Sequence, residues 1–397
     1  MSPVRSLGLR PMLPRDPAEP HRVSSTLELF FDLTFAVAIG VVSEQLAVLL
    51  GSGAVASGTF AYLFVFFGIW WAWMNFTWFA SAFATDDWLY RVLTIVQMAG
   101  VLIFAAGAAA AMDRFDFRIG TIGYVLMRLA VITLWLRAAY NGREFRATAL
   151  RYALGVSIVQ VAWLLRLLVP PALTVPSFAV LVIAELAVPI WAEQTRVTPF
   201  HPRHIAERYG LFTLIVLGEG LVAITHATIA ALQDASHIGP LLLIAASALV
   251  LVAGMWWIYF ARDQHDNLTS LPSTFGFGYL HYAIFAAAGA LAAGIEVALE
   301  QAGDHPTLPA ALGRATTTVP VAVFLLCVWV LALRPALPRR TSAAVLVLTV
   351  AVALAAFVPA GLPISALLVV AIVVVLEMDW RHHSNRESAV ASAEAID

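Results

Sequence analysis

The sequence predicts an all-α polytopic membrane protein, and its composition and the spacing of its apolar stretches both indicate this class. Of its 397 residues, 61% are hydrophobic and 12% are charged, whereas soluble domains are about 45–50% apolar and about 25% charged. Apolar stretches long enough to cross a hydrocarbon core of about 30 Å recur along the chain. They lack the strict alternation of a transmembrane β-barrel. We therefore expect about 12 transmembrane helices.

The same composition excludes other classes of protein. Twenty-three basic residues against 25 acidic ones give a formal net charge of −2, and no block of like charge suggests nucleic-acid binding. The single cysteine leaves no disulfide framework and no cysteine metal site. No nucleotide-binding loop or hydrolase nucleophile motif is present, so we expect no cofactor and no enzyme activity. The expected partners are membrane lipids and a small ion or other solute, with the oligomeric state left open.

The predicted elements follow one another with little chain between them. Residues 1–22 hold four arginines and several prolines without a long apolar run, so we expect a cytoplasmic tail and no cleaved signal peptide. Residues 381–397 form the expected C-terminal tail. The expected spans between the tails are 27–50, 58–82, 89–111, 118–140, 149–169, 174–192, 204–231, 238–260, 276–300, 309–333, 341–358 and 361–379.

The arginines predict which span ends face the cytoplasm. The chain has no lysine, and if the N-terminus is cytoplasmic, 18 of its 23 arginines fall in inner segments and four in outer ones, with Arg128 inside a span. Basic residues gather in cytoplasmic loops, so we expect both termini to be cytoplasmic.

Two halves of the chain share landmarks in the same order. Residues 28–37 align without a gap with residues 207–216, and a Gly-x-Trp-Trp pattern at 68–71 recurs at 254–257. This order predicts two parallel six-helix repeats, 23–196 and 197–380, related by an axis normal to the membrane.

Three motifs resemble signatures of the bacterial low temperature requirement protein A family. They are Glu28-Leu-Phe-Phe-Asp32-Leu-Thr-Phe-Ala-Val-Ala, His204-Ile-Ala-Glu207-Arg208 continuing to Glu219, and Asp86-Asp87-Trp-Leu-Tyr-Arg91 leading into Gln97-Met-Ala-Gly100. The resemblance covers about residues 22–380. It implies a multi-pass protein of the bacterial inner membrane that is associated with growth in the cold and has no settled biochemical activity. The first motif is also similar to the first-helix signature of the "FSD" potassium channels, with Phe31 at the serine position.

Ionisable residues inside the spans are the first candidate functional groups, because each costs about 2.5–3.5 kcal/mol on insertion scales. Helical rise places Glu219 and Arg128 near the middle of their spans. We therefore expect the two to pair, with Glu219 as the titrating group and Arg128 as its counter-charge. Glu185 is a further candidate somewhat to the inner side. The alternative is a structural ion pair that fixes helix register.

Glu28 and Asp32 lie one helical turn apart and face the same way. Two such carboxylates repel each other in a low-dielectric site, so a shared proton or a bound cation would stabilise them. We expect Asp32 to bind a cation or proton at the inner entrance. Ser25-Thr-Leu-Glu28 also fits a capping box, so the alternative for Glu28 is a role in helix capping.

His201, His204 and Glu207 lie at successive i+3 steps. This spacing permits a metal site, but helical zinc motifs usually place histidines at i and i+4, so we expect no metal. We expect His204 and Glu207 to cap their helix and to meet Arg208 or Arg91.

Asn75 and His281 are the remaining candidates. Asn75 lies in the aromatic cluster 70–78, which is typical of an interfacial belt, although Asn75 and inward-facing rings are also suited to line a vestibule or to sort cations. His281 is a lone intramembrane histidine near an inner span end, for which we favour a hydrogen-bonded structural role.

Together these residues predict a secondary transporter or ion-conducting protein that couples intramembrane carboxylates to a proton or cation. The alternative is a membrane structural or lipid-interaction protein whose buried pairs serve packing. An intramembrane lipid enzyme is disfavoured because no nucleophile–base set stands out.

Overall fold

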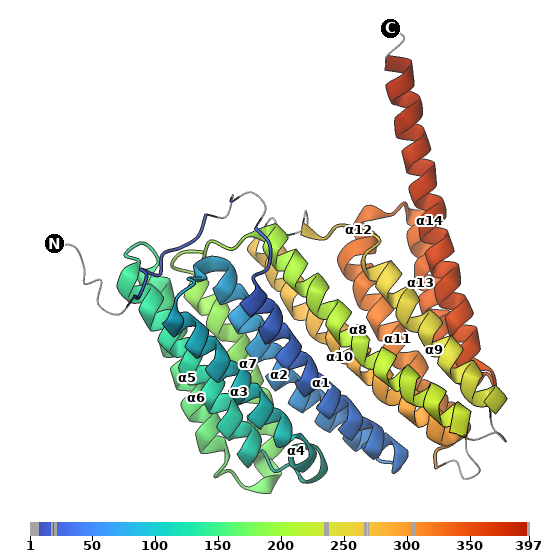
Figure 1. Cartoon of the computed structure of the whole chain (residues 1–397), viewed down its shortest axis with the longest axis horizontal. Coiled ribbons are helices and arrows are strands. Elements are labelled where there is room, and N and C mark those ends of the chain that lie inside the picture. The colour runs from blue at the N-terminus through green and yellow to red at the C-terminus, as the bar shows by residue number, and fades with distance from the viewer. Residues whose placement is uncertain are drawn as a thin grey trace. The chain divides into compact units, whose positions relative to one another are not determined.

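A computed structural model describes residues 8–16, 19, 22–233, 238–265, 268, 270–302 and 307–394, with side chains for all of these except 271 and 383–394. This part of the chain is helical and contains no strand (Figure 1). Twelve helical stretches in it are long and apolar enough to cross a membrane, which confirms the expected fold class.

The helices follow the predicted spans closely. The last two predicted spans are separate helical stretches, 339–357 and 361–382, and α14 continues as a helix to Glu394, inside the expected C-terminal tail. The main helices are α1 (Thr26–Gly51), α2 (Val55–Phe83), α3 (Trp88–Ala106), α4 (Ala108–Arg114), α5 (Arg118–Asn141), α6 (Arg146–Arg166), α7 (Thr174–Glu193), α8 (Pro202–Gln233), α9 (Ile238–Tyr259), α10 (Leu271–Gln301), α11 (Ala310–Val328), α12 (Arg334–Ala336), α13 (Arg339–Leu354) and α14 (Gly361–Glu394).

The chain divides into two compact units, and each is described by itself. Unit 1 contains residues 1–45 and 60–212, and unit 2 contains residues 46–59 and 213–397. These units are defined by contacts, so the expected repeats, 23–196 and 197–380, and the cytoplasmic position of both termini stay predictions.

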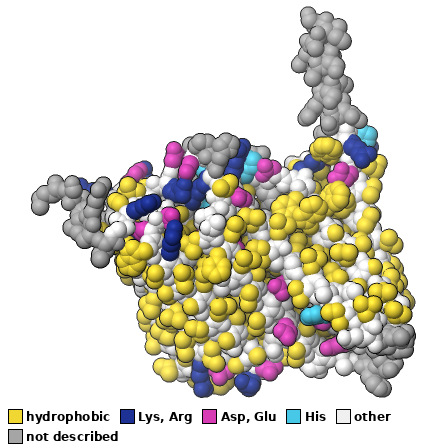
Figure 2. Space-filling model, in the orientation of Figure 1, with side chains coloured by type: hydrophobic (Ala, Val, Ile, Leu, Met, Phe, Trp, Pro, Cys, Tyr) yellow, Lys and Arg dark blue, Asp and Glu magenta, His cyan; other side chains and the backbone are white. Residues whose placement is uncertain are grey.

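In unit 1, α3, α5, α6 and α7 pack in sequence order, each against the next. α3 and α5 approach each other closely, because a Cβ on Gly123 would lie 2.4 Å from the carbonyl oxygen of Gly100. Only glycine lets two backbones come this near. On the face of unit 1 seen in Figure 2, charged side chains gather at the two ends of the helices and apolar ones cover the length between them.

In unit 2, α10 packs on α11, and α14 packs on both α9 and α13. A Cβ on Gly294 of α10 would lie 2.1 Å from the carbonyl oxygen of Thr316 in α11. α11 contains Pro320 and passes into a π-helical turn, Trp329–Leu333, before α12. A proline inside a helix removes a backbone hydrogen bond, and single π turns interrupt the regular ladder, so α11 is an interrupted helix.

Three helix starts that position the candidate site are capped by side chains. The capping box that was the alternative for Glu28 is present at the start of α1, because the backbone N–H and hydroxyl of Ser25 donate to Glu28, whose own N–H donates back to the Ser25 hydroxyl. Asp87 caps α3 by accepting the N–H of Tyr90. His201 caps α8, since its Nδ1 accepts the N–H of His204 at 3.2 Å. These caps satisfy backbone donors that a helix end leaves free.

Candidate functional site

Glu28, Asp32, His204 and Arg208 form one buried group in unit 1, which we name the Arg208 cluster. Arg208 donates through Nε and Nη2 to the two carboxylate oxygens of Asp32, at 3.1 and 2.5 Å. Its Nη1 lies 3.1 Å from Oε1 of Glu28, and Nε2 of His204 lies 3.2 Å from the same oxygen. Each of the four side chains is at most 4% exposed.

The cluster arises because three helices each contribute two residues one turn apart. Glu28 and Asp32 share a face of α1, and His204 and Arg208 share a face of α8. From α2, Trp73 donates its indole N–H to Asp32 at 2.7 Å, and the hydroxyl of Thr77 lies 3.4 Å from Nη2 of Arg208. Residues four apart lie above one another on a helix, so these pairs meet as three short ladders.

The charges of the Arg208 cluster do not balance within it. Two carboxylates face one guanidinium, so the cluster carries one net negative charge while His204 is neutral. Its hydrogen bonds are also incomplete: Oε1 of Glu28, Nη1 of Arg208 and both ring nitrogens of His204 have no well-aligned partner in the described part of the chain. Buried ionic groups are costly unless they are paired and hydrogen-bonded. The arrangement is therefore suited to accept one further positive charge, either a proton or a small cation.

A cavity of about 450 Å³ in unit 1 reaches Glu28. Its wall includes Tyr90, which is buried and whose hydroxyl has no partner among the described residues. Arg22 lies on the wall and donates to the carbonyls of Ser81 and Ala80. Burial lowers the pKa of Arg22 to about 10, so it stays charged at neutral pH. The full lining is Arg15, Arg22, Val23, Ser25, Thr26, Leu27, Glu28, Phe30, Ala84, Thr85, Asp86, Tyr90 and Arg91.

A second buried group, which we name the Arg128 cluster, joins Arg128, Tyr124 and Glu185 in unit 1. Nη2 of Arg128 lies 2.8 Å from Glu185, so the expected pair of Arg128 with Glu219 is wrong. Helical depth alone suggested that pair, whereas the contact of α5 with α6 and of α6 with α7 brings Glu185 to Arg128 within unit 1. Glu219 belongs to unit 2.

Glu185 is the better-satisfied partner in the Arg128 cluster. Its carboxylate also accepts hydrogen bonds from the hydroxyl of Tyr124 at 3.0 Å and from the indoles of Trp163 and Trp71, at 3.1 and 2.8 Å. Nε and Nη1 of Arg128 have no described partner. A carboxylate with four donors around it has its hydrogen-bonding capacity well satisfied, so this cluster has the properties of a structural brace.

Glu207 and Asn75, two further predicted residues of unit 1, form other contacts. Glu207 accepts the N–H of Ser24, just before α1, at 3.3 Å, so the expectation that it caps its own helix is wrong, and Arg91 pairs with Asp86. The amide of Asn75 donates to the carbonyl of Trp71.

His281 and Glu219 belong to unit 2. His281 is buried, with Nδ1 2.7 Å from the carbonyl of Phe277 and Nε2 2.8 Å from the hydroxyl of Tyr259, which agrees with the favoured hydrogen-bonded role. Glu219 is half-buried, and no described residue forms an ion pair or hydrogen bond with it. Whether it titrates stays a prediction.

Sequence reasoning missed Arg208 and two tryptophans as members of the buried groups. Trp71 and Trp73 were expected in an interfacial belt, but both are fully buried and donate to carboxylates. The available signal was the spacing of His204 and Arg208, which matches that of Glu28 and Asp32 and predicts facing ladders.

Comparison with known proteins agrees with these motifs. The family model described as bacterial low temperature requirement A protein (LtrA) matches residues 23–377. Uncharacterized protein RA0937 of Rhizobium meliloti (strain 1021) is 29% identical over 273 residues, a match that spans 64% of this chain and 64% of that protein. Because the family model covers most of the chain, including the three helices that form the Arg208 cluster, the protein belongs to the bacterial low temperature requirement A family.

Proposed function

We propose that this protein is a secondary transporter or an ion-conducting membrane protein, in which the Arg208 cluster binds a proton or a small cation. The observation that carries the proposal is the charge of the cluster: two buried carboxylates share one guanidinium. One added positive charge makes the group neutral. Intramembrane carboxylates that are costly to bury are typical of ion pathways and proton relays.

The cavity supports the proposal by giving Glu28 a route to solvent. Glu28 lines the cavity, while Asp32 is completely buried behind it and is tied to Arg208 and Trp73. An ion or proton would therefore meet Glu28 first. Its arrival would weaken the contacts of Glu28 with His204 and Arg208, and Arg208 would transmit the change to Asp32. Glu219 remains a candidate for a further titrating site.

Ion flux into liposomes tests the proposal directly. Purified protein is reconstituted, gradients of H⁺, Na⁺ and K⁺ are imposed one at a time, and flux is followed with ion-sensitive dyes. We expect flux above that of empty liposomes for at least one ion, and a fall of at least tenfold in Glu28→Gln. The matched control is Glu193→Gln, which changes a buried carboxylate held by Tyr152 and Thr198 away from the cavity. It is expected to keep the wild-type rate.

The second candidate function is a non-transporting structural or lipid-interaction protein linked to growth in the cold. The observation that favours it is the well-satisfied Glu185, which has the contacts of a brace. Folded protein without flux of any of the three ions, or a Glu28→Gln variant with wild-type flux, would refute the proposal. The first of these results, together with reduced thermal stability of Glu185→Gln, would favour the structural function.

A further inference from the structure

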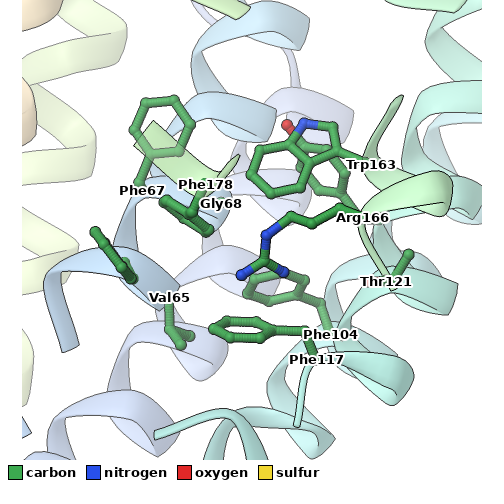
Figure 3. A pocket seen from close by; sticks show the side chains of 12 residues that line it. Val65, Phe67, Gly68, Phe104, Phe117, Thr121, Trp163, Arg166 and Phe178 are labelled. Carbon is green, nitrogen blue, oxygen red and sulfur yellow. The ribbon is translucent and has the colours of Figure 1, made fainter. Parts of the chain in front are cut away.

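We propose that unit 1 contains a binding site for a small monovalent anion of halide size, at the N-terminus of α5 and beside Arg166. The site lies apart from the Arg208 cluster, and its existence does not depend on whether the protein transports cations. Figure 3 shows the guanidinium of Arg166 pointing into a pocket among aromatic side chains. Part of the pocket wall comes from Phe117, Gly120, Thr121, Trp163, Arg166 and Phe178.

The first observation is that Arg166 is a buried cation without a counter-ion. Its side chain is 7% exposed, and no described carboxylate forms an ion pair with it. Nη2 donates to the carbonyl of Thr174 at 3.2 Å, and Nε has no partner. Its guanidinium carbon lies 4.7 Å from the ring centre of Phe117 and 5.2 Å from that of Phe178. These rings attract the cation, but they neither accept a directed bond from Nε nor cancel its charge.

Glu185, the buried carboxylate behind the pocket, is already paired. Trp163 and Tyr124 line the pocket, and both donate to Glu185 behind them. Glu185 is neutralised by Arg128 at 2.8 Å. Glu185 therefore does not balance the positive charge of Arg166, and burial of an unpaired charge has a large free-energy cost.

The second, independent observation is the helix end that forms part of the same wall. α5 begins at Arg118 after Phe117, and no side chain of Phe117 caps it. Asp116 accepts the N–H of Arg118, and the N–H of Thr121 donates to the carbonyl of Phe117. The N–H groups of residues 119 and 120 have no described acceptor. The N-terminus of a 24-residue helix carries a partial positive charge and favours anions.

The volume of the pocket admits a small anion. About 40 Å³ is free beside the guanidinium, which exceeds the about 10–15 Å³ that a cavity needs to hold one water molecule. A chloride ion therefore fits beside the guanidinium. Water would satisfy Nε but would leave the charge of Arg166 unpaired. A small anion would accept a hydrogen bond from Nε and would also balance the charge of Arg166. Thr121 supplies a hydroxyl in the pocket wall.

Chloride titration of the purified full-length protein tests the site. Thermal unfolding in detergent is measured while chloride replaces gluconate at constant ionic strength. We expect a saturable rise of the unfolding temperature in the wild type, and an apparent chloride dissociation constant at least tenfold higher in Arg166→Gln. The matched control is Arg151→Gln on the same helix. Arg151 donates to the carbonyl of Trp191, does not line the pocket, and is expected to keep the wild-type response.

A second variant keeps the test valid if Arg166→Gln does not fold. A Cβ on Gly120 would contact nothing closer than Phe104, at 3.7 Å, so Gly120→Ala should fold while it narrows the pocket. We expect weaker chloride binding with Arg166 intact. An unfolding temperature independent of chloride in the wild type would overturn the proposal. An equal response in the wild type, Gly120→Ala and Arg166→Gln would assign the effect to an adventitious ion only.

Discussion

Removal of the Arg208 guanidinium should destabilise the protein more than removal of either carboxylate that it holds. Arg208 donates twice to Asp32 and lies 3.1 Å from Glu28, with all three side chains buried. Breaking a buried ion pair from one side costs about 3–5 kcal/mol, because the other charge stays buried and unpaired. Arg208→Gln leaves two buried carboxylates without their cationic partner. We therefore expect the free energy of unfolding to fall by about 5 kcal/mol, at the upper end of that range.

Asp32→Asn should cost much less. The amide keeps an oxygen for the indole of Trp73, and Arg208 keeps Glu28 as its partner. The cluster is then electrically balanced, and the main loss is that of a charge-assisted hydrogen bond, about 1.5–3 kcal/mol. In the double variant Asp32→Asn with Arg208→Gln, one of the two orphaned carboxylates is gone. We therefore expect the double variant to be more stable than Arg208→Gln alone by about 2 kcal/mol, so that the two substitutions are strongly non-additive.

Chemical unfolding in detergent micelles, followed by near-ultraviolet circular dichroism, gives the four free energies of unfolding of this cycle. All four proteins are compared at one pH and one detergent concentration, because stability depends on both. The reasoning is refuted if Arg208→Gln is no less stable than Asp32→Asn. It is also refuted if the second substitution adds its full cost to the first, since Asp32 and Arg208 would then not be coupled.

Two further predictions concern other parts of the chain. Gly294→Ala should destabilise unit 2 by more than 1 kcal/mol, about the cost of overpacking, because its Cβ would meet a backbone carbonyl of α11 at 2.1 Å. Gly218→Ala has nothing within 4 Å of its Cβ and should be neutral or slightly stabilising in the same unfolding assay. For Asp87, burial acts to raise the pKa, but hydrogen bonds from Arg137 and from two backbone N–H groups hold the pKa of this carboxyl below its usual range. Ionised Asp87 therefore stabilises the fold above its unfolded value of about 3.9, and this contribution is lost as pH falls through the folded-state pKa. The difference in unfolding temperature between wild type and Asp87→Asn should accordingly shrink below about pH 4.

Control variants distinguish these specific effects on stability from a general loss of folding. Equal stability of the Gly294→Ala and Gly218→Ala variants would contradict the close approach of α10 and α11. For the pH dependence, the control is Asp86→Asn, since Asp86 is exposed and pairs with the exposed Arg91. A difference between wild type and Asp87→Asn that stays constant from pH 7 to pH 3 would contradict the assigned role of Asp87.

The spans were predictable because their signal is local. A hydrocarbon core sets the length of each apolar stretch, and the backbone must satisfy its hydrogen bonds within the helix. The capping box of Ser25 and Glu28 is local in the same way, and the structure contains it. The family resemblance was likewise readable from short motifs, and the family model covers residues 23–377.

The partners of the buried charges were not predictable in the same way. Depth along a helix is given by residue count, and it placed Arg128 and Glu219 at similar levels, but depth does not say which helices adjoin. Arg128 and Glu185 are 57 residues apart in the sequence and meet because their helices pack together in unit 1. Counting residues along one helix does not give this packing. The Arg208 cluster required knowledge that α1, α2 and α8 meet, although each ladder alone was visible as an i, i+4 spacing.

The position of α2 explains why buried tryptophans and buried carboxylates occur together in this chain. Trp71 and Trp73 are two residues apart, so they project to nearly opposite sides of the helix. One donates to Glu185 and the other to Asp32, each through an indole N–H that can only donate. A buried indole N–H needs an acceptor, and in an apolar bundle the acceptors available here are the two carboxylates. α2 therefore donates one hydrogen bond to the Arg128 cluster and one to the Arg208 cluster. Because both indoles belong to one helix, a rotation of α2 about its axis would move both hydrogen bonds together.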